Sequence, residues 1–546
     1  MLATDFLLIA SLLVFSIAWL WRSLGRRDLV LWTAAGVGLV GGLIGVLQGR
    51  WQAALGAAIA AVFLLVLTVR RLRGARPRVR VPIATGVGFI LLTALATALL
   101  YSIPVFTLPD PDGPHAVGVR DFELTDHART GVLYAATDEP RRLAVRVWYP
   151  AATTDGYEPE PYATTSELET TYPAIATDEL GMPSFFHSHL RGIDTHTYRD
   201  APVVTDSTLP VVFFEHGLGG HLSQNSVLME YLASHGYVVF SVAHPYDAAP
   251  IVFADGDVIR LPEAAAVERR EGRSDYPEEV MDLVMEADPK RVGGTTYDER
   301  FEGFLGYIRF ADLVDDRVYD TSPEVWVEDV LFVEDALAEG QAPDSIADIL
   351  QHADLTRVGH IGMSFGGSTA AALAYQDPRA AAAVNLDGSD FHHVGYNADI
   401  PVPLLMLYSD EMEVLGAVGG SPFGWNDFLY ERFETAGTRD DVVRVRLTGV
   451  NHTGVTDNQL MTRGPLHGIL TGSLEGRRAL DIVNGLVGDF LDQYLRGIPT
   501  DFPVAQLERY RGDLDSHGVS AIREWWQAKT PDERAAIEEA LEKARA

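Results

Sequence analysis

The sequence predicts an α/β protein, in which a mostly parallel sheet is flanked by helices and preceded by an all-α membrane segment. Four apolar stretches open the 546-residue chain, and strand patterns alternate with helical patterns in the remainder. Alternation of that kind is typical of parallel strands joined by crossover helices. Residues able to do chemistry follow several of those strands, as expected for a site at one edge of a sheet.

The two parts of the chain differ in charge. Residues 1–108 contain ten Arg and two acidic residues, a net charge of +8, whereas the whole chain carries −33. The remainder is therefore strongly acidic, which argues against nucleic acid as a partner because phosphate neutralisation needs clustered Lys and Arg. The chain contains no cysteine, so neither a disulfide framework nor a thiolate metal site is expected.

The apolar stretches predict a membrane anchor over residues 1–108. They are Phe6–Trp21, Leu29–Leu47, Trp51–Val69 and Pro82–Ile103. Each is close to the roughly 20 residues that cross a bilayer as a helix. A cleaved signal peptide is the alternative for the first stretch, but three more follow and no clear cleavage site precedes them. We therefore predict four transmembrane spans.

The loops between these stretches predict the orientation of the anchor. The first and third loops are rich in arginine, whereas the second contains only Arg50. The arginines of the first and third loops are Arg22, Arg26, Arg27, Arg70, Arg71, Arg73, Arg76, Arg78 and Arg80. Positively charged loops stay in the cytoplasm, which places the chain beyond Ile103 outside. The sequence thus predicts a multi-pass protein of the cell membrane with its larger part on the extracytoplasmic side.

Two patterns that suggest a bound group are better explained otherwise. Gly36-x-Gly38-x-x-Gly41 matches a dinucleotide-binding string, but it lies inside an apolar span without a preceding strand or a following acid. Its glycines are typical of a smooth face for close helix packing. No cofactor is predicted.

A histidine-rich stretch offers candidate metal ligands. His187, His189, Asp194 and His196 lie in the polar, turn-rich region 151–208. No helical spacing or supporting partner accompanies them, so a solvated loop is the preferred interpretation and no metal site is predicted.

The strongest chemical signal is a turn around Ser364. Residues 362–366 read Gly-Met-Ser-Phe-Gly and stand between an apolar strand pattern and an Ala-rich helical one. Strand, tight turn and helix in this order are the context of a nucleophile elbow. Glycines are needed two residues either side of the serine because Cβ atoms there would meet the neighbouring strand and helix. Ser364 is the predicted nucleophile, and a glycine turn without chemistry is the alternative.

A glycine-rich loop is the candidate second part of the site. The predicted strand Leu209–Phe214 runs into residues 215–220, Glu-His-Gly-Leu-Gly-Gly. A loop in this place supplies an oxyanion-binding N–H that pairs with the one following the nucleophile. The amides of Leu218 and Phe365 are therefore candidate oxyanion donors, and a plain glycine turn is the alternative for the loop.

Three strands after Ser364 end at residues that could complete a triad. These strands are predicted over residues 380–386, 402–408 and 442–447. They lead to Asp387, Asp410 and His452, and the order serine, acid, histidine is that of hydrolases built on this architecture. His452 is the predicted base. The two aspartates compete for the role of acid, and the strand pattern alone slightly favours Asp410.

Four motifs together resemble one hydrolase family. They are His216-Gly-Leu-Gly-Gly, Leu232-Ala-Ser-His-Gly-Tyr-Val-Val239, Gly362-Met-Ser-Phe-Gly-Gly367 and Leu386-Asp387. They resemble the plasma (type II) platelet-activating factor acetylhydrolase family and its bacterial esterase relatives over roughly residues 115–500. The resemblance implies an α/β-hydrolase fold with Ser364 as nucleophile, His452 as base, and Leu218 and Phe365 as oxyanion donors. It also implies Asp387 as the acid, from its Leu-Asp context and its spacing from Ser364.

The chain departs from that family at two places. Met363 stands where the family commonly has His, and His244-Pro-Tyr-Asp247 replaces a more basic sequence. These departures concern the choice of substrate. The acidic stretch 254–320 is either a cap over the site or a surface excursion.

The sequence therefore predicts an anchor over 1–108, a hydrolase domain over 109–500 and a C-terminal helical appendage over 501–546. The predicted activity is that of a membrane-anchored serine carboxylic ester hydrolase without cofactor or metal, acting on short-acyl esters through an acyl-enzyme. Its expected substrates include small-molecule esters and lipids such as platelet-activating-factor-like phospholipids. A polyester or cutinase-like esterase and an inert membrane-tethered binding protein are the alternatives, and the oligomeric state is left open.

Overall fold

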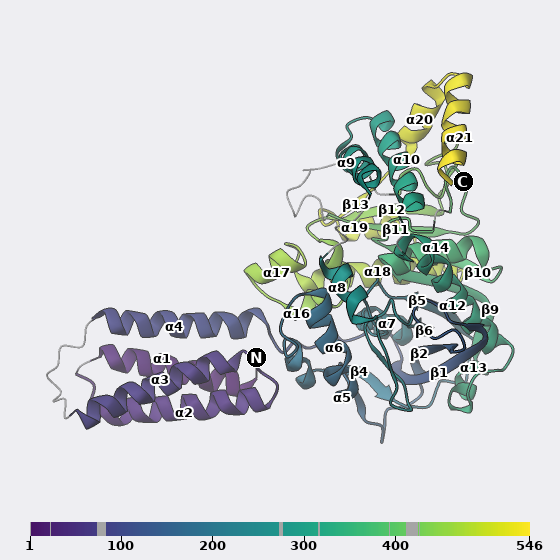
Figure 1. The fold of residues 1–546 in the computed structure, drawn as a ribbon. Coiled ribbons are helices and arrows are strands. Elements are labelled where there is room, and N and C mark those ends of the chain that lie inside the picture. The colour runs from purple at the N-terminus through teal and green to yellow at the C-terminus, as the bar shows by residue number, and fades with distance from the viewer. Residues whose placement is uncertain are drawn as a thin grey trace. The chain divides into compact units, whose positions relative to one another are not determined.

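The protein has the α/β architecture that its sequence predicts (Figure 1). The computed structural model describes residues 2–21, 23–73, 83–271, 277–314, 317–392, 394–410, 424 and 426–545. Arg22, Arg76, Arg78 and Arg80, which contribute to the predicted orientation, lie outside the described residues. The chain divides into two compact units. The first comprises Met1–Leu108, Pro161–Thr195 and Leu460–Leu470, and the second Pro109–Glu160, His196–Gln459 and Thr471–Ala546.

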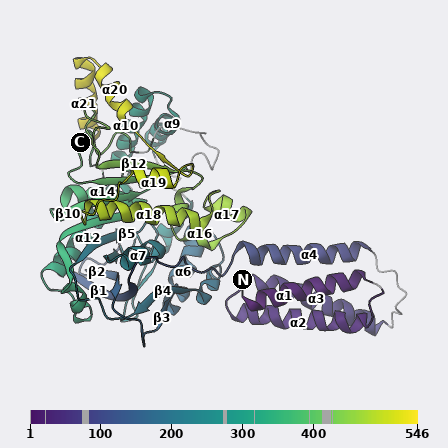
Figure 2. The ribbon, with the colours of Figure 1, turned by 180° about the vertical axis from the view of Figure 1, so that it is seen from behind.

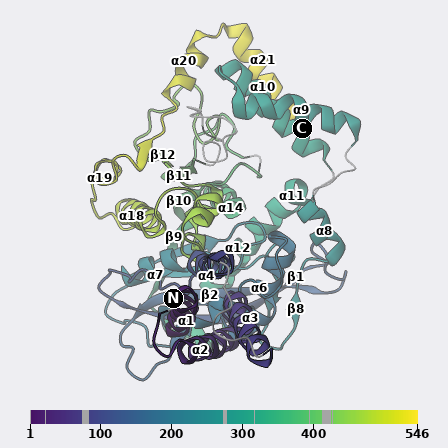
Figure 3. The ribbon, with the colours of Figure 1, turned by 90° about the vertical axis from the view of Figure 1, so that its left-hand side faces the viewer.

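Among its described residues, the first unit contains four helices that are long and apolar enough to cross a membrane (Figures 1 and 3). They are α1 (Ala3–Leu20), α2 (Arg27–Leu47), α3 (Ala53–Leu72) and α4 (Ile83–Ser102). In their shared core the rings of Phe15 and Phe63 stack with centroids 3.8 Å apart. A Cβ added at Gly42 would lie 2.8 Å from the Cβ of Ala57. The glycines of α2 thus provide the smooth packing face that the sequence predicts.

Two segments from far along the chain also belong to the first unit. They form α5 (Thr165–Glu169), α6 (Thr171–Ala174), the π-helix η1 (Ile175–Glu179), the 3-10 helix η2 (Ser188–Gly192) and α17 (Pro465–Leu470). The Trp51 indole N–H donates to the carbonyl of Phe186 at 2.8 Å. The Arg463 amide donates to the carbonyl of Ser102, at the end of α4, at 2.9 Å. These segments therefore pack with the ends of the apolar helices, which hydropathy alone does not reveal.

The region interpreted as a solvated loop is folded, and two of its histidines are buried. His187 and His189 are 5% and 1% exposed, with each Nδ1 near a backbone carbonyl. The solvated-loop interpretation is wrong for this pair, because aromatic side chains such as Tyr172 and Phe186 pack against His187. His196 belongs to the second unit, where it pairs with a buried carboxylate.

The second unit is organised around an 11-stranded sheet. Its strands are β1 (Ala116–Thr130), β2 (Pro140–Ala151), β3 (Pro159–Pro161), β4 (Asp194–Arg199), β5 (Leu209–Glu215), β6 (Val238–Val242), β9 (Ala353–Met363), β10 (Ala380–Leu386), β11 (Leu404–Ser409), β12 (Val442–Leu447) and β13 (Leu514–Ser516). Their order is β13-β12-β11-β10-β9-β5-β6-β2-β1-β4-β3. The strands from β12 to β6 pair in parallel, whereas β1 and β2 form an antiparallel ribbon that joins β6. The mostly parallel sheet is confirmed.

Helices cover both faces of this sheet (Figure 2). One face is covered by α7 (Ser226–Ser234) and α18 (Gly476–Tyr494), and the other by α12 (Ser322–Ala338), α13 (Ala347–Leu350) and α14 (Phe365–Gln376). Successive residues of β5 point to opposite faces. Phe214 accordingly packs with α7 and α18, whereas Phe213 packs with α12. A continuous apolar strand is therefore buried on both sides, as expected for parallel sheets.

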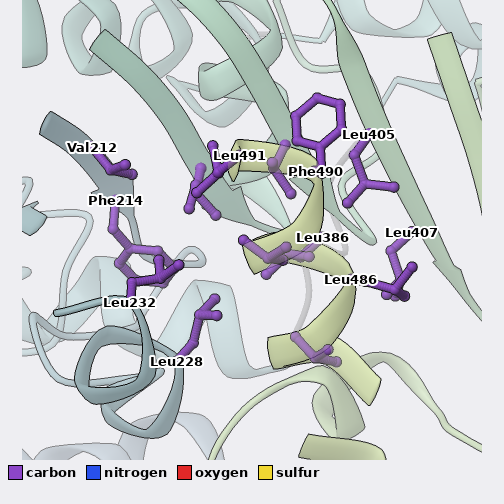
Figure 4. Close-up of a cluster of buried hydrophobic side chains, with 14 of the residues drawn as sticks. Val212, Phe214, Leu228, Leu232, Leu386, Leu405, Leu407, Leu486, Phe490 and Leu491 are labelled. Carbon is purple, nitrogen blue, oxygen red and sulfur yellow. The ribbon is translucent and has the colours of Figure 1, made fainter. Parts of the chain in front are cut away.

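Large aliphatic and aromatic side chains fill the layer between the sheet and α18 (Figure 4). Leu486, Phe490 and Leu491 of α18 are buried against strand residues such as Leu405 and Leu407. Burial of one such side chain contributes roughly 1.5–3 kcal/mol. This layer fixes the strands whose ends carry the candidate site.

The acidic stretch 254–320 packs into the second unit. It contains β8 (Val258–Ile259), which pairs with β7 (Ile251–Val252) just ahead of it, and the helices α8 (Glu263–Glu271), α9 (Glu278–Gly293), α10 (Tyr297–Leu313) and α11 (Arg317–Asp320). Phe301 and Phe304 of α10 each have their ring centroid 5.4 Å from that of Phe428. The Tyr307 hydroxyl donates to the carbonyl of Asp390 at 2.7 Å. Helix α10 is thus part of a buried aromatic cluster, which a surface excursion would not be.

The C-terminal region adds a strand as well as helices. After α19 (Val504–Arg509), β13 pairs antiparallel with β12, and α20 (Ser520–Ala528) and α21 (Pro531–Arg545) follow. Trp525 and Trp526 pack against Phe433, with ring centroids 5.8 Å and 5.4 Å apart. The prediction of a purely helical appendage is wrong for β13, which covers the backbone edge that β12 would otherwise expose.

The buried His189 predicts that the protein loses stability in mild acid. Burial, and after it the charges of His187 and Arg50, lowers the pKa of His189 to about 3. In the unfolded chain this histidine is protonated below about pH 6.5. Its contribution to the free energy of unfolding is therefore complete above about pH 6.5 and is lost as the pH falls towards about 3. Thermal unfolding in detergent between about pH 7.5 and about pH 5 should show the loss, at up to roughly 1.4 kcal/mol per pH unit.

The variant His189→Gln tests this assignment. It removes the titrating group, so its stability should depend less steeply on pH than that of the wild type. His127→Gln is the control, because His127 lies exposed on β1. An equal pH slope in the wild type and in His189→Gln would contradict the prediction.

Candidate active site

Ser364 occupies a strained turn between β9 and α14. Its φ of 56° lies in the left-handed region that non-glycine residues avoid. The Ser364 amide donates to the carbonyl of Leu386 at 2.9 Å, which ties the turn to the end of β10. A Cβ at Gly362 would collide with the backbone of Gly366, and a Cβ at Gly366 with the carbonyl of Glu215. The glycines are therefore required by the absence of space, as the sequence predicts.

The imidazole of His452 lies between a hydroxyl and a carboxylate. His452 opens the short helix η4 (His452–Val455), and its Nε2 is 2.9 Å from Ser364 Oγ. Its Nδ1 is 2.7 Å from Asp387 Oδ2. A carboxylate accepts a hydrogen bond from Nδ1–H, and in that tautomer Nε2 is unprotonated and can accept the serine proton. The arrangement has the geometry of a Ser-His-Asp triad.

The carboxylate of Asp387 is held by the strand ends around it. Asp387 follows β10 with a φ of 58°, and its amide donates to the carbonyl of Leu407 at 2.8 Å. Its second oxygen, Oδ1, accepts from the amide of Ser409 at 2.7 Å. Its side chain is 2% exposed, whereas that of His452 is 33% exposed. Solvent and substrate therefore reach the imidazole more easily than the carboxylate behind it.

Asp410 holds the loop that carries His452. Its amide donates to the carbonyl of Val450 at 2.7 Å, and its Oδ2 accepts from the amide of Gly449 at 3.4 Å. Asp410 therefore contacts the backbone ahead of His452, whereas Asp387 contacts the ring. The structure thus brings Ser364, Asp387 and His452 together and gives Asp410 a different neighbour.

The same loop is anchored from two other sides. The amide of Asn451 donates to the carbonyl of Thr471 at 3.1 Å. The side-chain amide of Asn225, which precedes α7, donates to the carbonyl of Val455 at 2.9 Å. The segment at Thr471 and the start of helix α7 therefore both hold the loop of His452, although its ring is partly exposed.

The two candidate oxyanion donors lie beside Ser364. Phe365 is the first residue of α14, where a helix has no internal acceptor for its amide. The amides on either side of Leu218 are occupied, because Gly217 donates to Gln224 Oε1 and Gly219 to the carbonyl of Asp247, each at 2.7 Å. A Cβ at Gly217 would lie 3.4 Å from the Cβ of Ser364. This loop therefore runs directly beside the serine.

Sequence reasoning missed the side chains that support these two donor segments. Gln224 is polar and unremarkable in the sequence, yet its side chain fixes Gly217. Trp326 lies in the interior of α12 and packs against Phe365, with ring centroids 4.7 Å apart. His244 carried one signal, since it follows strand β6 at the same edge of the sheet as the triad. Nothing in the sequence marks Trp326.

One buried group of described residues has the composition of a metal site. His360 Nε2 lies 3.2 Å from Asp377 Oδ2 and 3.6 Å from Glu334 Oε1. The guanidinium of Arg379 contacts the other oxygens of both carboxylates, at 2.9 Å and 3.0 Å. Burial raises the pKa of Glu334 well above its usual range, which favours the protonated acid. The guanidinium of Arg379 therefore places a positive charge beside both carboxylates.

A solved structure with the same fold places the second unit in a known class. The chain is similar to a ferulic acid esterase from Streptomyces cinnamoneus with a TM-score of 0.50 and 22% sequence identity, covering 76% of this chain and 99% of that one. At this identity the likeness concerns the fold, which is the α/β-hydrolase fold. The sheet order and the serine turn described above agree with it.

Sequence comparisons identify the chain as a carboxylic ester hydrolase of that fold. The family described as Platelet-activating factor acetylhydrolase, isoform II matches residues 101–271. The chain is 24% identical over 420 residues to the platelet-activating factor acetylhydrolase of Cavia porcellus, across 74% of this chain and 81% of the relative. It is 25% identical over 321 residues to a probable 1-alkyl-2-acetylglycerophosphocholine esterase of Arthroderma benhamiae, across 55% and 64%. The resemblance predicted from the four motifs is confirmed.

The serine turn predicts that Gly366→Ala destroys the active site. A Cβ at Gly366 would collide with backbone of Glu215 and His216, which cannot move without displacing β5. We expect loss of esterase activity and destabilisation of roughly 2–5 kcal/mol, measured by p-nitrophenyl acetate hydrolysis and by thermal unfolding. Gly518→Ala is the matched control, because its Cβ would meet nothing within 4 Å. Full activity in Gly366→Ala would contradict this account.

Proposed function

We propose that the protein is a membrane-anchored serine esterase that hydrolyses short-acyl esters through an acyl-enzyme. The observation that carries the proposal is the hydrogen-bond chain from Ser364 Oγ through the His452 ring to Asp387. These three groups come from the carboxyl ends of three strands in a chain whose relatives are esterases. In such a chain, an aligned hydroxyl, imidazole and carboxylate favour nucleophilic acyl transfer.

In the proposed mechanism His452 acts first as base and then as acid. Its Nε2 takes the proton of Ser364 while Oγ attacks the ester carbonyl, and the amides of Leu218 and Phe365 hold the oxyanion. The alcohol leaves with the proton from His452, and an acyl-serine remains. A water molecule then loses a proton to His452 and attacks the acyl-serine, and His452 passes that proton to Ser364 Oγ as the acid is released. Asp387 keeps Nδ1 protonated and stabilises the imidazolium.

The proposed substrate class is a short-acyl phospholipid of the 1-alkyl-2-acetylglycerophosphocholine type. The relative from Cavia porcellus is described as a platelet-activating factor acetylhydrolase, and the one from Arthroderma benhamiae as a probable 1-alkyl-2-acetylglycerophosphocholine esterase. An enzyme anchored by four helices works where phospholipid esters are concentrated. Both considerations support a lipid ester over a soluble polyester.

The proposed location is the cell membrane, with the second unit on the extracytoplasmic side. The four helices α1 to α4 have the length and hydropathy of membrane spans. The connections from α1 to α2 and from α3 to α4 are flanked by arginines, namely Arg26, Arg27, Arg70 and Arg71. The connection from α2 to α3 carries Trp51. Arginine-rich loops favour the cytoplasm, and tryptophan is common at both interfaces.

Removal of the serine hydroxyl tests the proposed mechanism. Ser364→Ala should abolish labelling by a fluorophosphonate probe and lower kcat for p-nitrophenyl acetate by at least about 10³-fold, because the variant lacks the proposed nucleophile. The probe is detected by in-gel fluorescence of the membrane fraction. A wild-type protein that neither labels nor turns over would support the inert binding protein instead.

The proposed roles of the two aspartates predict losses of kcat of different size in the same assay. Asp387→Asn should lower kcat by about 10⁴-fold, because the amide no longer fixes the Nδ1 proton of His452. Asp410→Asn keeps the size of the side chain and leaves the ring contact in place, so its kcat per labelled site should fall far less. The assignment is wrong if only Asp410→Asn loses turnover.

The choice between substrates is testable with matched esters. A 2-acetyl phosphocholine in vesicles should be hydrolysed with a higher kcat/KM than the same head group carrying a long 2-acyl chain. Preferential release of soluble products from a polyester film would favour the cutinase-like alternative.

The absence of cysteine makes the proposed orientation directly testable. Single cysteines introduced by Ser23→Cys, between α1 and α2, and Ser207→Cys, ahead of β5, are the only thiols in their variants. A membrane-impermeant maleimide should label Ser207→Cys in spheroplasts and label Ser23→Cys only after permeabilisation. The reverse pattern would place the second unit in the cytoplasm.

A further inference from the structure

A buried layer of ionisable and aromatic side chains lies beneath the two segments that carry the candidate oxyanion donors. Its members come from strand ends and from α12, and each is fully buried. They are Glu215, His216, His244, Asp247, Trp326 and Asp329. Burial of a charge is unfavourable unless the charge is paired, so these side chains stabilise the core less than apolar side chains of the same size would.

His244 is held at both ring nitrogens. Its Nε2 lies 2.9 Å from Glu215 Oε2 and its Nδ1 lies 3.0 Å from Asp329 Oδ2. Burial lowers the pKa of His244, but the hydrogen bonds to these carboxylates outweigh it and the net direction is upward. Arg141 in turn binds Asp329 through two nitrogens, at 2.6 Å and 3.0 Å, and donates to the carbonyl of Pro245 at 3.1 Å. The ring therefore has one orientation, fixed from both ends.

The ring of His244 supports Trp326. The two rings stack with centroids 3.8 Å apart and planes 12° from parallel. The Trp326 indole N–H donates to Asp247 Oδ2 at 3.0 Å, which fixes the tryptophan within its plane. A cation or an aromatic ring over the face of tryptophan is a favourable contact, and it is stronger when water is excluded. Trp326 is thus held from below by His244 and at its edge by Asp247.

Trp326 contacts both segments that carry the candidate donors. Its ring lies edge-on to Phe365, with centroids 4.7 Å apart, and edge-on to His216, with centroids 5.0 Å apart. Phe365 carries one candidate amide, and His216 lies two residues before Leu218, which carries the other. One tryptophan ring therefore packs against both of the segments that carry the candidate donors.

A second route runs from this layer to the loop of Leu218. Asp247, which accepts the indole proton, also offers its carbonyl to the amide of Gly219 at 2.7 Å. The amide of His244 points at His216 Nε2 at 3.4 Å, while His216 Nδ1 lies 2.8 Å from the carbonyl of Gly217. The residues on both sides of Leu218 are thus bonded to the layer or to one another.

We infer that Trp326, braced by His244, is a positioning residue of the oxyanion hole that holds the amides of Leu218 and Phe365 at their working separation. The inference rests on the proposed function, because it assigns these amides to the oxyanion. Donors that are aimed in advance at the developing charge contribute strongly to catalysis, and a displacement of about 1 Å costs up to roughly 100-fold. The layer fits this task because its side chains are fully buried and one ring, that of Trp326, contacts both segments that carry the donors.

The test measures turnover per active site in variants of the layer. Trp326→Leu and His244→Gln should lower kcat for p-nitrophenyl acetate, normalised to the sites that a fluorophosphonate titrates, by about tenfold to about 100-fold. KM should stay within about twofold, because the lost interaction acts on the transition state. Trp326→Phe keeps a ring in the layer and loses the bond to Asp247, so a smaller fall of several-fold is expected.

A trifluoromethyl ketone gives an independent readout, since it forms a tetrahedral adduct whose oxyanion occupies the same hole. Its Ki should rise in Trp326→Leu and His244→Gln by about the factor by which kcat falls. A purely structural role would lower Tm and the titratable fraction without changing the Ki of the sites that remain. The Ki therefore separates positioning from packing.

His360→Gln is the matched control. His360 is also a fully buried histidine paired with a carboxylate, Asp377, but it lies on β9 and the ring that it contacts is that of Phe213 on β5. The control should lower Tm while leaving kcat per titrated site within about twofold of the wild type. The inference is overturned if all variants of the layer behave like His360→Gln. Failure of the wild type to label at Ser364 would instead overturn the proposed function.

Discussion

The lack of space around Ser364 is the constraint on which the rest of the second unit depends. Strand β9 must turn into α14 within one residue, and that residue adopts a φ of 56°. The turn closes only because Gly362 and Gly366 bring no Cβ against the backbones beside them. Strain of this kind persists only where the surrounding structure enforces it. The parallel strands on either side, and the helices α7, α12 and α18 that cover them, supply that enforcement.

A parallel sheet then brings distant residues to one edge. Strand β10 ends at Asp387, and the loop after β12 carries His452, so two pieces of chain about 65 residues apart meet beside Ser364. The backbone at each strand end is bonded to a neighbouring strand or loop, as the amides of Asp387 and Ser409 illustrate. The positions of the side chains at the site therefore depend on the register in which the strands pair. Register is specified strongly here because both faces of the sheet are buried.

The sequence predicted those parts of the site that local chemistry dictates. Ser364 was marked by its glycines, and His452 by its place after a strand. The choice between Asp387 and Asp410 could not be made from pattern, because both follow buried strands and only the register of β10 and β11 decides which carboxylate faces the ring. Trp326 had no local signal, since a tryptophan inside an amphipathic helix is ordinary core. The assignment of residues 161–195 and 460–470 to the unit of the apolar helices depends on tertiary packing and lies beyond hydropathy.

The buried ionisable groups separate two uses of the same chemistry. Around His360, Arg379 contacts both carboxylates, and burial raises the pKa of Glu334 within a structural core. Around His244, Arg141 holds the pKa of Asp329 well below its usual range despite the opposing effect of burial, and the resulting carboxylate orients the imidazole. A buried ion pair is a weak source of net stability, because desolvation offsets most of the attraction. A buried ion pair does fix the orientation of its side chains, since each hydrogen bond has one favourable geometry. A layer that must hold two amides toward one oxygen needs side chains of fixed orientation more than it needs additional stability.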